Sequence, residues 1–150
     1  MRVIIQRVNE ASVEIDGKIK SSIGIGLMVL VGIEEADTKE DCDWLAGKLT
    51  GLRIFDDENG VMNRSVCDVD GEVLIVSQFT LHALTKKGNR PSYIKAAKHA
   101  TAIPLYEYFC TSVARNLGKD VQTGTFAADM KVALINNGPV TIWIDSKMKE

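Results

Sequence analysis

The sequence predicts an α/β fold: a compact single domain over residues 1–150, with a largely antiparallel or mixed sheet of about seven or more strands and two main helices. Three observations predict it. Short apolar runs of strand length recur along the chain. Two stretches carry apolar residues at helical spacing, and Asp-Gly pairs mark tight turns between neighbouring strands. A chain of 150 residues is long enough to bury its own core.

The first half of the sheet is predicted near the amino end. Residues 2–8 and 11–15 are typical of strands, and Asp16-Gly17 predicts a tight turn into the next strand. Residues 27–31 form a continuous apolar run, which indicates a strand buried on both faces. Further strands are expected at residues 53–55, 72–79, 130–135 and 140–145. Short connections between neighbours favour antiparallel pairing.

Two amphipathic helices are predicted. The first covers about 39–50, with Thr38 as N-cap and Asp41 completing a capping box. The second is expected to follow Thr101, with Pro104 tolerated in its first turn and Gly118 ending it. We expect both helices to cover one face of the sheet.

Composition excludes several function classes. A formal net charge of −2 argues against broad, non-specific binding of nucleic acid. No stretch approaches the ~20 apolar residues needed to cross a bilayer, so we expect a cytoplasmic protein without a membrane partner. The three cysteines and two histidines do not have metal-ligand spacing, so neither a metal nor another cofactor is expected.

Polar residues directly follow the predicted strand at 72–79. Ser77, Gln78 and Thr80 bring hydroxyls, an amide and backbone N–H groups to the end of a buried strand, where they could stabilise an oxyanion. They could equally satisfy the strand's own terminal backbone groups. Ser77 or Thr80 could act as a nucleophile with His82 as base, but no carboxylate is placed to orient that histidine. The sequence contains no usual acid–base pair.

Two further motifs have both a structural and a functional interpretation. Asn136-Asn137-Gly138-Pro139 is typical of a plain hairpin turn, although Gly138 also permits close backbone approach. The loop from Lys86 and Lys87 to Arg90 suits phosphate contacts, although charged loops are usually only solvated.

Taken together, these motifs closely resemble the D-aminoacyl-tRNA deacylase family. The resemblance covers essentially the whole chain, including its opening strand. The segments that carry it are Ser77-Gln78-Phe79-Thr80-Leu81, Lys87-Gly88-Asn89-Arg90-Pro91-Ser92, Asn136-Asn137-Gly138-Pro139-Val140-Thr141, Leu52-Arg53-Ile54-Phe55 and Ala128-Asp129-Met130.

The resemblance implies a symmetric homodimer that hydrolyses the ester linking a D-amino acid to the 3′ end of its tRNA, a chiral proofreading step of translation. Ser77, Gln78, Phe79 and Thr80 of one subunit would form the catalytic wall. A cis Gly138-Pro139 of the other subunit would enter this pocket and leave no room for an L side chain. Glycyl-tRNA is an implied secondary substrate. The residues expected to support the pocket or to bind substrate are Arg7, Asn136, Asn137, Phe126 and Met130.

The resemblance further implies catalysis without a side-chain nucleophile, assisted by the 2′-hydroxyl of the terminal adenosine and by backbone N–H groups near Phe79 and Thr80. Lys86, Lys87 and Arg90 would contact the tRNA. Two other hypotheses remain open at this point. One is a non-catalytic RNA-binding or interaction module with the same fold, and the other is a small-molecule esterase that uses Ser77 or Thr80.

Overall fold

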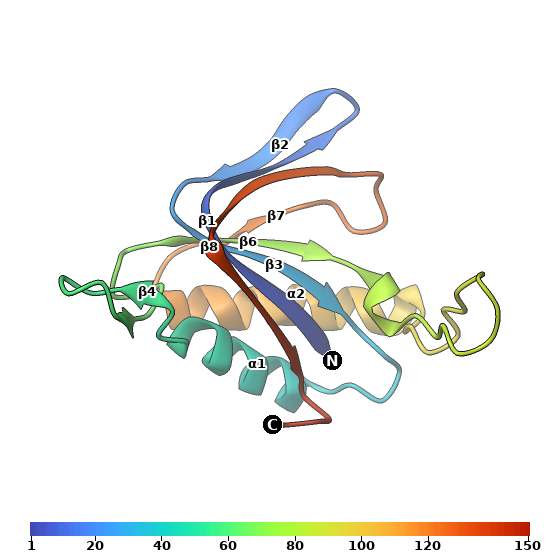
Figure 1. Cartoon of the computed structure of the whole chain (residues 1–150). Coiled ribbons are helices and arrows are strands. Elements are labelled where there is room, and N and C mark those ends of the chain that lie inside the picture. The colour runs from blue at the N-terminus through green and yellow to red at the C-terminus, as the bar shows by residue number, and fades with distance from the viewer.

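The structure, a computed structural model, describes residues 1–150 and has two helices beside a mixed sheet (Figure 1). In chain order the elements are β1 (Arg2–Ile15), β2 (Lys18–Ile23), β3 (Gly26–Gly32), α1 (Lys39–Gly51), β4 (Phe55–Asp56), β5 (Met62–Arg64), β6 (Glu72–Ser77), the short 3-10 helix η1 (Phe79–His82), α2 (His99–Leu117), β7 (Gln122–Thr123) and β8 (Lys131–Asp145). None of the helices is long and apolar enough to span a membrane.

The strand β1 organises the sheet because both of its edges are paired along most of its length. One edge pairs with β8 throughout, whereas the other pairs first with β3 and then with β2, all antiparallel. From β1 the sheet continues through β3 to β6 and then β7, and β6 is parallel to both β3 and β7. The predicted mixed, largely antiparallel sheet is confirmed.

Both helices cover one face of the sheet, as predicted (Figure 1). Leu45 and Leu49 of α1 and Phe109 and Val113 of α2 are fully buried against β1, β3 and β6. The predicted capping box of α1 forms: the Thr38 N–H donates to the Asp41 carboxylate, 2.8 Å away. A second apolar cluster lies among β1, β2, β3, β6 and β8. The sheet is therefore buried on both faces at its centre, which explains the uninterrupted apolar sequence of β3.

The interpretation of Asn136–Pro139 as a plain hairpin turn, one of the two given for this motif, is wrong. Residues 131–145 form one strand, β8, and both halves of it pair antiparallel with β1. Gln6 pairs with Thr141 and Val8 with Asn136, so a step of two residues on β1 corresponds to a step of five on β8. The Asn136–Pro139 segment is therefore a bulge that leaves the sheet and returns to it, and not a chain reversal.

The strands expected at 2–8 and 11–15 form the single strand β1. Three further element boundaries differ from the prediction. β6 ends at Ser77, because the following residues turn into η1. The strand expected at 53–55 begins only at Phe55. The helix α2 begins at His99, two residues before Thr101, so Pro104 lies beyond its first turn. The Glu35 carboxylate accepts hydrogen bonds from the Lys98 N–H and the Thr101 hydroxyl, and this distant partner supports the earlier start.

Candidate functional site

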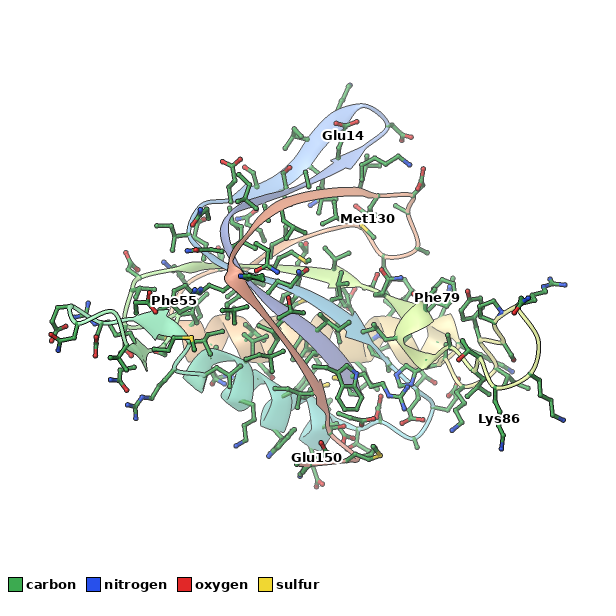
Figure 2. The ribbon with its side chains drawn as sticks, in the orientation of Figure 1. Glu14, Phe55, Phe79, Lys86, Met130 and Glu150 are labelled. Atoms are coloured by element: carbon green, nitrogen blue, oxygen red, sulfur yellow. The ribbon has the colours of Figure 1, made fainter.

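A cavity of about 570 Å³ opens where β3 and β6 end. It lies between these strands, η1, the amino end of α2 and the segment that leads into β8, and its lining is mostly apolar. It is lined by Val31, Ile33, Val76, Ser77, Gln78, Phe79, Tyr93, Ala96, Ala97, Lys98, His99, Ala102, Phe126, Ala127, Ala128, Asp129, Met130 and Val132. Figure 2 shows Phe79 and Met130 at the same end of the molecule. An apolar cavity with a few polar groups is the usual form of a small-molecule site.

The strand end predicted as catalytic forms one wall of this cavity. Ser77, Gln78 and Phe79 line it, whereas Thr80, the next residue in η1, is not among the lining residues. The Gln78 N–H donates to the Val31 carbonyl, but the N–H groups of Phe79 and Thr80 donate to no protein acceptor. They are the first two N–H groups of η1, which helical geometry leaves unpaired. Two free backbone donors beside a cavity can bind a carbonyl oxygen or an oxyanion.

The side chains near these donors do not form a nucleophile–base pair. The Thr80 hydroxyl accepts a hydrogen bond from the Gln78 side-chain amide, 2.5 Å away. His82 is 1% exposed, and neither of its ring nitrogens has a hydrogen-bond partner in the protein. No hydrogen bond therefore joins His82 to either candidate hydroxyl.

Two of the three cysteines, Cys42 and Cys110, do not supply a thiolate. Burial, with the nearby carboxylates of Asp37, Asp41 and Asp43, raises the pKa of Cys42 to about 12. Burial likewise raises the pKa of Cys110 to about 12. Since the thiolate is the nucleophilic form, both thiols are inert near neutral pH. No cluster of three or more His, Cys, Asp or Glu side chains able to hold a metal ion occurs in the structure.

The bulge in β8 is centred on Gly138. The Gly138–Pro139 peptide bond is cis, and Gly138 has φ of 127°, in a region that L side chains rarely adopt. A Cβ atom added at Gly138 would lie 2.8 Å from an Arg7 guanidinium nitrogen and 3.0 Å from Val140. Both the backbone conformation and the close neighbours therefore require glycine at this position.

The side chains of Arg7 and Asn136 hold the bulge. Arg7, only 8% exposed, donates from Nε to the Asn137 carbonyl at 3.0 Å and from a terminal nitrogen to the Ile54 carbonyl at 2.6 Å. The Asn136 side chain accepts from the Val140 N–H and donates to the Thr141 hydroxyl, which closes the base of the bulge. Arg7 and Asn136 thus fix the shape of a segment that leaves the sheet.

The bulge does not reach the cavity of its own chain. Gly138, Pro139 and Asn137 are exposed, and none of them is among the cavity-lining residues. Ile135 and Trp143, on the same strand, are 51% and 46% exposed. A rigid exposed bulge between exposed apolar side chains has the character of a contact surface for another chain.

The basic loop lies outside the cavity as well. Figure 2 shows Lys86 on a loop that projects beyond Phe79. Leu84 and Ser92 exchange two backbone hydrogen bonds, of 2.8 and 3.0 Å, that close the base of this loop. Lys86, Lys87 and Arg90 are exposed on it.

Several cavity residues could not be assigned from sequence motifs. Tyr93, Lys98 and His99 line the cavity, as does Asp129 on the opposite segment. Ala127, also in the wall, has φ of 63°, a left-handed conformation that is uncommon for alanine and frequent at functional sites. Two of them had a signal in the sequence: Tyr93 directly follows the motif that ends at Ser92, and Asp129 belongs to the motif Ala128-Asp129-Met130.

Comparison with known proteins identifies the class and then the family. The chain is an enzyme of the deacylase class, because the sequence model for D-Tyr-tRNA(Tyr) deacylase matches residues 4–145. The chain belongs to the D-Tyr-tRNA(Tyr) deacylase family, which confirms the family resemblance seen in its motifs.

The relatives match over their full lengths. The D-aminoacyl-tRNA deacylases of Phocaeicola vulgatus and Bacteroides fragilis are 67% and 65% identical over 150 residues, 100% of both chains in each comparison. That of Flavobacterium johnsoniae is 65% identical over the same coverage.

Two solved structures share the fold. One, described as c-Myc DNA unwinding element binding protein, has a TM-score of 0.90 and 37% identity, covering 97% of this chain and 98% of that chain. A probable eukaryotic D-amino acid tRNA deacylase has a TM-score of 0.82 over 95% and 97% of the two chains. At 20% identity this second structure supports the fold alone.

Proposed function

We propose that this protein hydrolyses the ester bond of D-aminoacyl-tRNA and releases the free D-amino acid and the tRNA, with residues 1–150 acting as one domain. The full-length relatives at 60–67% identity, all named D-aminoacyl-tRNA deacylase, carry the proposal. The site is compatible with it, since a cavity of about 570 Å³ lies in the range that holds molecules the size of an aminoacyl-adenosine.

Backbone donors and the substrate supply the chemistry in this proposal. Water attacks the ester carbonyl carbon, and the free N–H groups of Phe79 and Thr80 stabilise the negative charge that forms on its oxygen. Each such donor typically contributes ~3 kcal/mol to transition-state stabilisation. The bond from that carbon to the ribose oxygen then breaks. The proton taken from water passes by way of the 2′-hydroxyl to the ribose oxygen, which leaves as a hydroxyl.

The absence of a hydrogen-bonded nucleophile–base pair supports this scheme over covalent catalysis. The Thr80 hydroxyl is engaged by Gln78 and has no base beside it. The test is turnover of D-tyrosyl-tRNA by purified wild-type and Thr80→Ala proteins. The variant should retain appreciable activity, because its backbone N–H is unchanged. Complete loss of turnover in a folded Thr80→Ala protein would favour a threonine nucleophile instead.

Chiral selection is proposed to come from a second copy of the chain. Because Gly138 and Pro139 are exposed and lie outside their own cavity, they can meet a cavity only in a partner. Held rigid by Arg7 and Asn136, the partner's backbone would lie against the substrate α-carbon and exclude an L side chain. Phe126 and Met130 would border the bound aminoacyl group. Glycine has no side chain to exclude, so glycyl-tRNA should also be hydrolysed.

The dimer has its own test. The chain has a mass of 16.4 kDa, so light scattering at working concentration should give about twice that value. A single species at the mass of one chain would contradict the shared site.

A second candidate function is RNA binding without catalysis, and the exposed Lys86, Lys87 and Arg90 favour it. In the deacylase proposal these cations contact the tRNA backbone but do not take part in the reaction. Charge reversal at all three positions should therefore weaken tRNA binding and raise KM while turnover persists at saturation. If the RNA-binding hypothesis is correct, the wild-type protein binds tRNA and cleaves no ester.

A further inference from the structure

Two exposed aromatic side chains stand together at the mouth of the cavity. Phe79 and Tyr93 are 57% and 40% exposed, and both line the cavity. Their ring centroids are 5.0 Å apart at an interplanar angle of 80°, so the rings meet edge to face. In this arrangement one ring uses only its edge and leaves its own faces free. The neighbouring Ile94 is 83% exposed, which extends the apolar surface outward.

The chain around this pair has a strongly one-sided charge. Residues 73–106 contain no Asp or Glu, although the whole chain has a net charge of −2. The same stretch contains Lys86, Lys87, Arg90, Lys95 and Lys98. None of these five cations forms an ion pair in the structure.

Acidic residues from other elements also lie near this segment, among them Glu34, whose backbone pairs with Ala96. Glu35 accepts hydrogen bonds from the Lys98 backbone and the Thr101 hydroxyl, and these bonds, together with the positive charge of Lys98, hold the pKa of its carboxyl below the usual value. Asp129, across the cavity, pairs with Lys131 at 3.0 Å. Neither Lys95 nor Lys98 forms a salt bridge, so both ammonium groups can contact a bound anion, although Glu35 offsets part of the charge of Lys98.

Backbone hydrogen bonds fix the segment that carries Tyr93. The Ala96 N–H donates to the Tyr93 carbonyl at 3.0 Å, and the Ala97 N–H donates to the Ile33 carbonyl at 2.8 Å. Leu84 and Ser92 close the preceding loop. The aromatic pair and the two lysines are thus presented by an ordered surface, which limits the entropy lost when a ligand binds.

We propose that Phe79, Tyr93, Lys95 and Lys98 form a platform for the unpaired nucleotides that precede the esterified adenosine. The inference rests on the proposed function, since it assumes that the aminoacyl-adenosine occupies the cavity. Exposed aromatic faces beside unpaired cations are the features that single-stranded nucleic acid binds, by base stacking and phosphate contacts. The platform lies at the mouth of the cavity, where the chain of nucleotides attached to that adenosine has to leave.

The proposal is tested by comparing two D-tyrosyl esters, one of adenosine alone and one of the trinucleotide CCA. The measured quantity is the ratio of kcat/KM for the trinucleotide ester to kcat/KM for the adenosine ester. In the wild-type protein we expect a ratio of about ten or more, the typical effect of stacking one base. Tyr93→Leu should lower the ratio about tenfold, whereas Tyr93→Phe, which keeps the ring, should preserve it.

The charged part of the platform has a separate readout. Binding of single-stranded nucleic acid weakens as salt is added. In a plot of log binding constant against log salt concentration, each phosphate contact adds about 0.7 to the steepness of the slope. For the trinucleotide ester, log kcat/KM plotted against log salt concentration should therefore be less steep by about 0.7 in Lys95→Ala than in the wild type. The matched control is the Lys18→Ala, Lys20→Ala double variant, which removes two exposed cations of β2 and should change neither ratio nor slope. A wild-type ratio near one, or a Tyr93→Leu ratio equal to that of the wild type, would overturn the platform.

Different results would disprove the platform and the deacylase function. If neither ester is hydrolysed, the deacylase proposal is wrong. Whether the platform binds nucleotides is then tested alone, by fluorescence anisotropy with single-stranded RNA that ends in CCA and carries no amino acid. Weaker binding by Tyr93→Leu than by the wild type would support the platform. Equal binding by the two proteins would overturn it even without turnover.

Discussion

Arg7 donates a hydrogen bond from Nε to the carbonyl of Asn137, 3.0 Å away and directly before Gly138. The same guanidinium donates to the Ile54 carbonyl and lies 3.5 Å from the Asp56 carboxylate. One buried side chain of β1 thus joins the bulge of β8 to the start of β4. The proposed selection against L substrates depends on the shape of the bulge. Arg7 should therefore affect activity through the bulge, without contacting the substrate bound in its own subunit.

Arg7→Lys should therefore be a severe change in spite of its conserved charge. A lysine ammonium cannot donate in the planar, forked geometry that reaches both the Asn137 and Ile54 carbonyls. We expect the free energy of unfolding to fall by about 1–3 kcal/mol, the cost of a buried acceptor without a partner. We also expect kcat/KM for D-tyrosyl-tRNA to fall at least about tenfold. Urea unfolding and ester hydrolysis measure the two effects, and wild-type activity in Arg7→Lys would argue against the coupling.

Gly138→Ala should abolish most of the hydrolysis. The added Cβ would meet Arg7 and Val140 and would occupy a backbone conformation that costs an L residue roughly 1–2 kcal/mol. Gly60→Ala is the matched control, because Gly60 also has a positive φ, of 75°, but its added Cβ would have no neighbour within 4 Å. The control should lose some stability and keep its turnover. Equal activity of the two variants would show that the bulge does not need glycine for function.

His82→Leu should stabilise the protein. The imidazole is buried, and neither nitrogen has a protein hydrogen-bond partner, so its removal from water is uncompensated. Replacing it with an apolar side chain of similar size should raise the free energy of unfolding by about 1 kcal/mol. Denaturant unfolding measures this, and His99→Leu, at an exposed position, should stay within about 0.5 kcal/mol of the wild type. A clear loss of stability in His82→Leu would mean that the ring nitrogens of His82 do have hydrogen-bond partners.

Asp41 should contribute stability that is lost in acid. Burial raises the pKa of its carboxyl, but hydrogen bonds from Lys147 and the Thr38 N–H outweigh this and hold the pKa well below the usual 3.8. Since the folded-state pKa is the lower one, the stabilisation is fully present above the unfolded-state value. It disappears as the pH falls below that value toward the folded-state pKa.

The corresponding experiment compares wild type and Asp41→Asn between pH 7 and pH 2. Their free energies of unfolding should differ by about 1–2 kcal/mol at pH 7, and the gap should narrow as the pH falls below about 4. Glu40→Gln, at an exposed neighbour in the same helical turn without an ion pair, is the control. A gap of constant size across this pH range would contradict the assignment to the Asp41 charge.

The sequence correctly predicted those elements that depend on residues close to one another in the chain. Asp16-Gly17 forms the expected turn with positive φ at both residues, and the Thr38–Asp41 capping box forms as expected. The start of α2 was wrong because the carboxylate that supports it, Glu35, comes from far earlier in the chain. A local pattern cannot show which distant group satisfies a helix terminus.

The hairpin error at Asn136–Pro139 has a similar physical reason. An Asn-Gly pair between two apolar runs suits a chain reversal, and only the pairing with β1 shows that the second run continues in the same direction. Ser77, Gln78 and Phe79 line the cavity, and their catalytic role stays a prediction. Tyr93, Lys98 and His99 reach that cavity only through the tertiary fold. Whether Gly138 and Pro139 enter a partner's cavity stays a prediction.

The most direct test of the account is the hydrolysis of D-tyrosyl-tRNA and L-tyrosyl-tRNA by the purified protein, measured side by side. We expect rapid loss of the D ester while the L ester remains intact, because the partner's Gly138-Pro139 backbone excludes an L side chain. Equal cleavage of both esters would contradict selection by the bulge, and cleavage of neither would contradict the deacylase function itself.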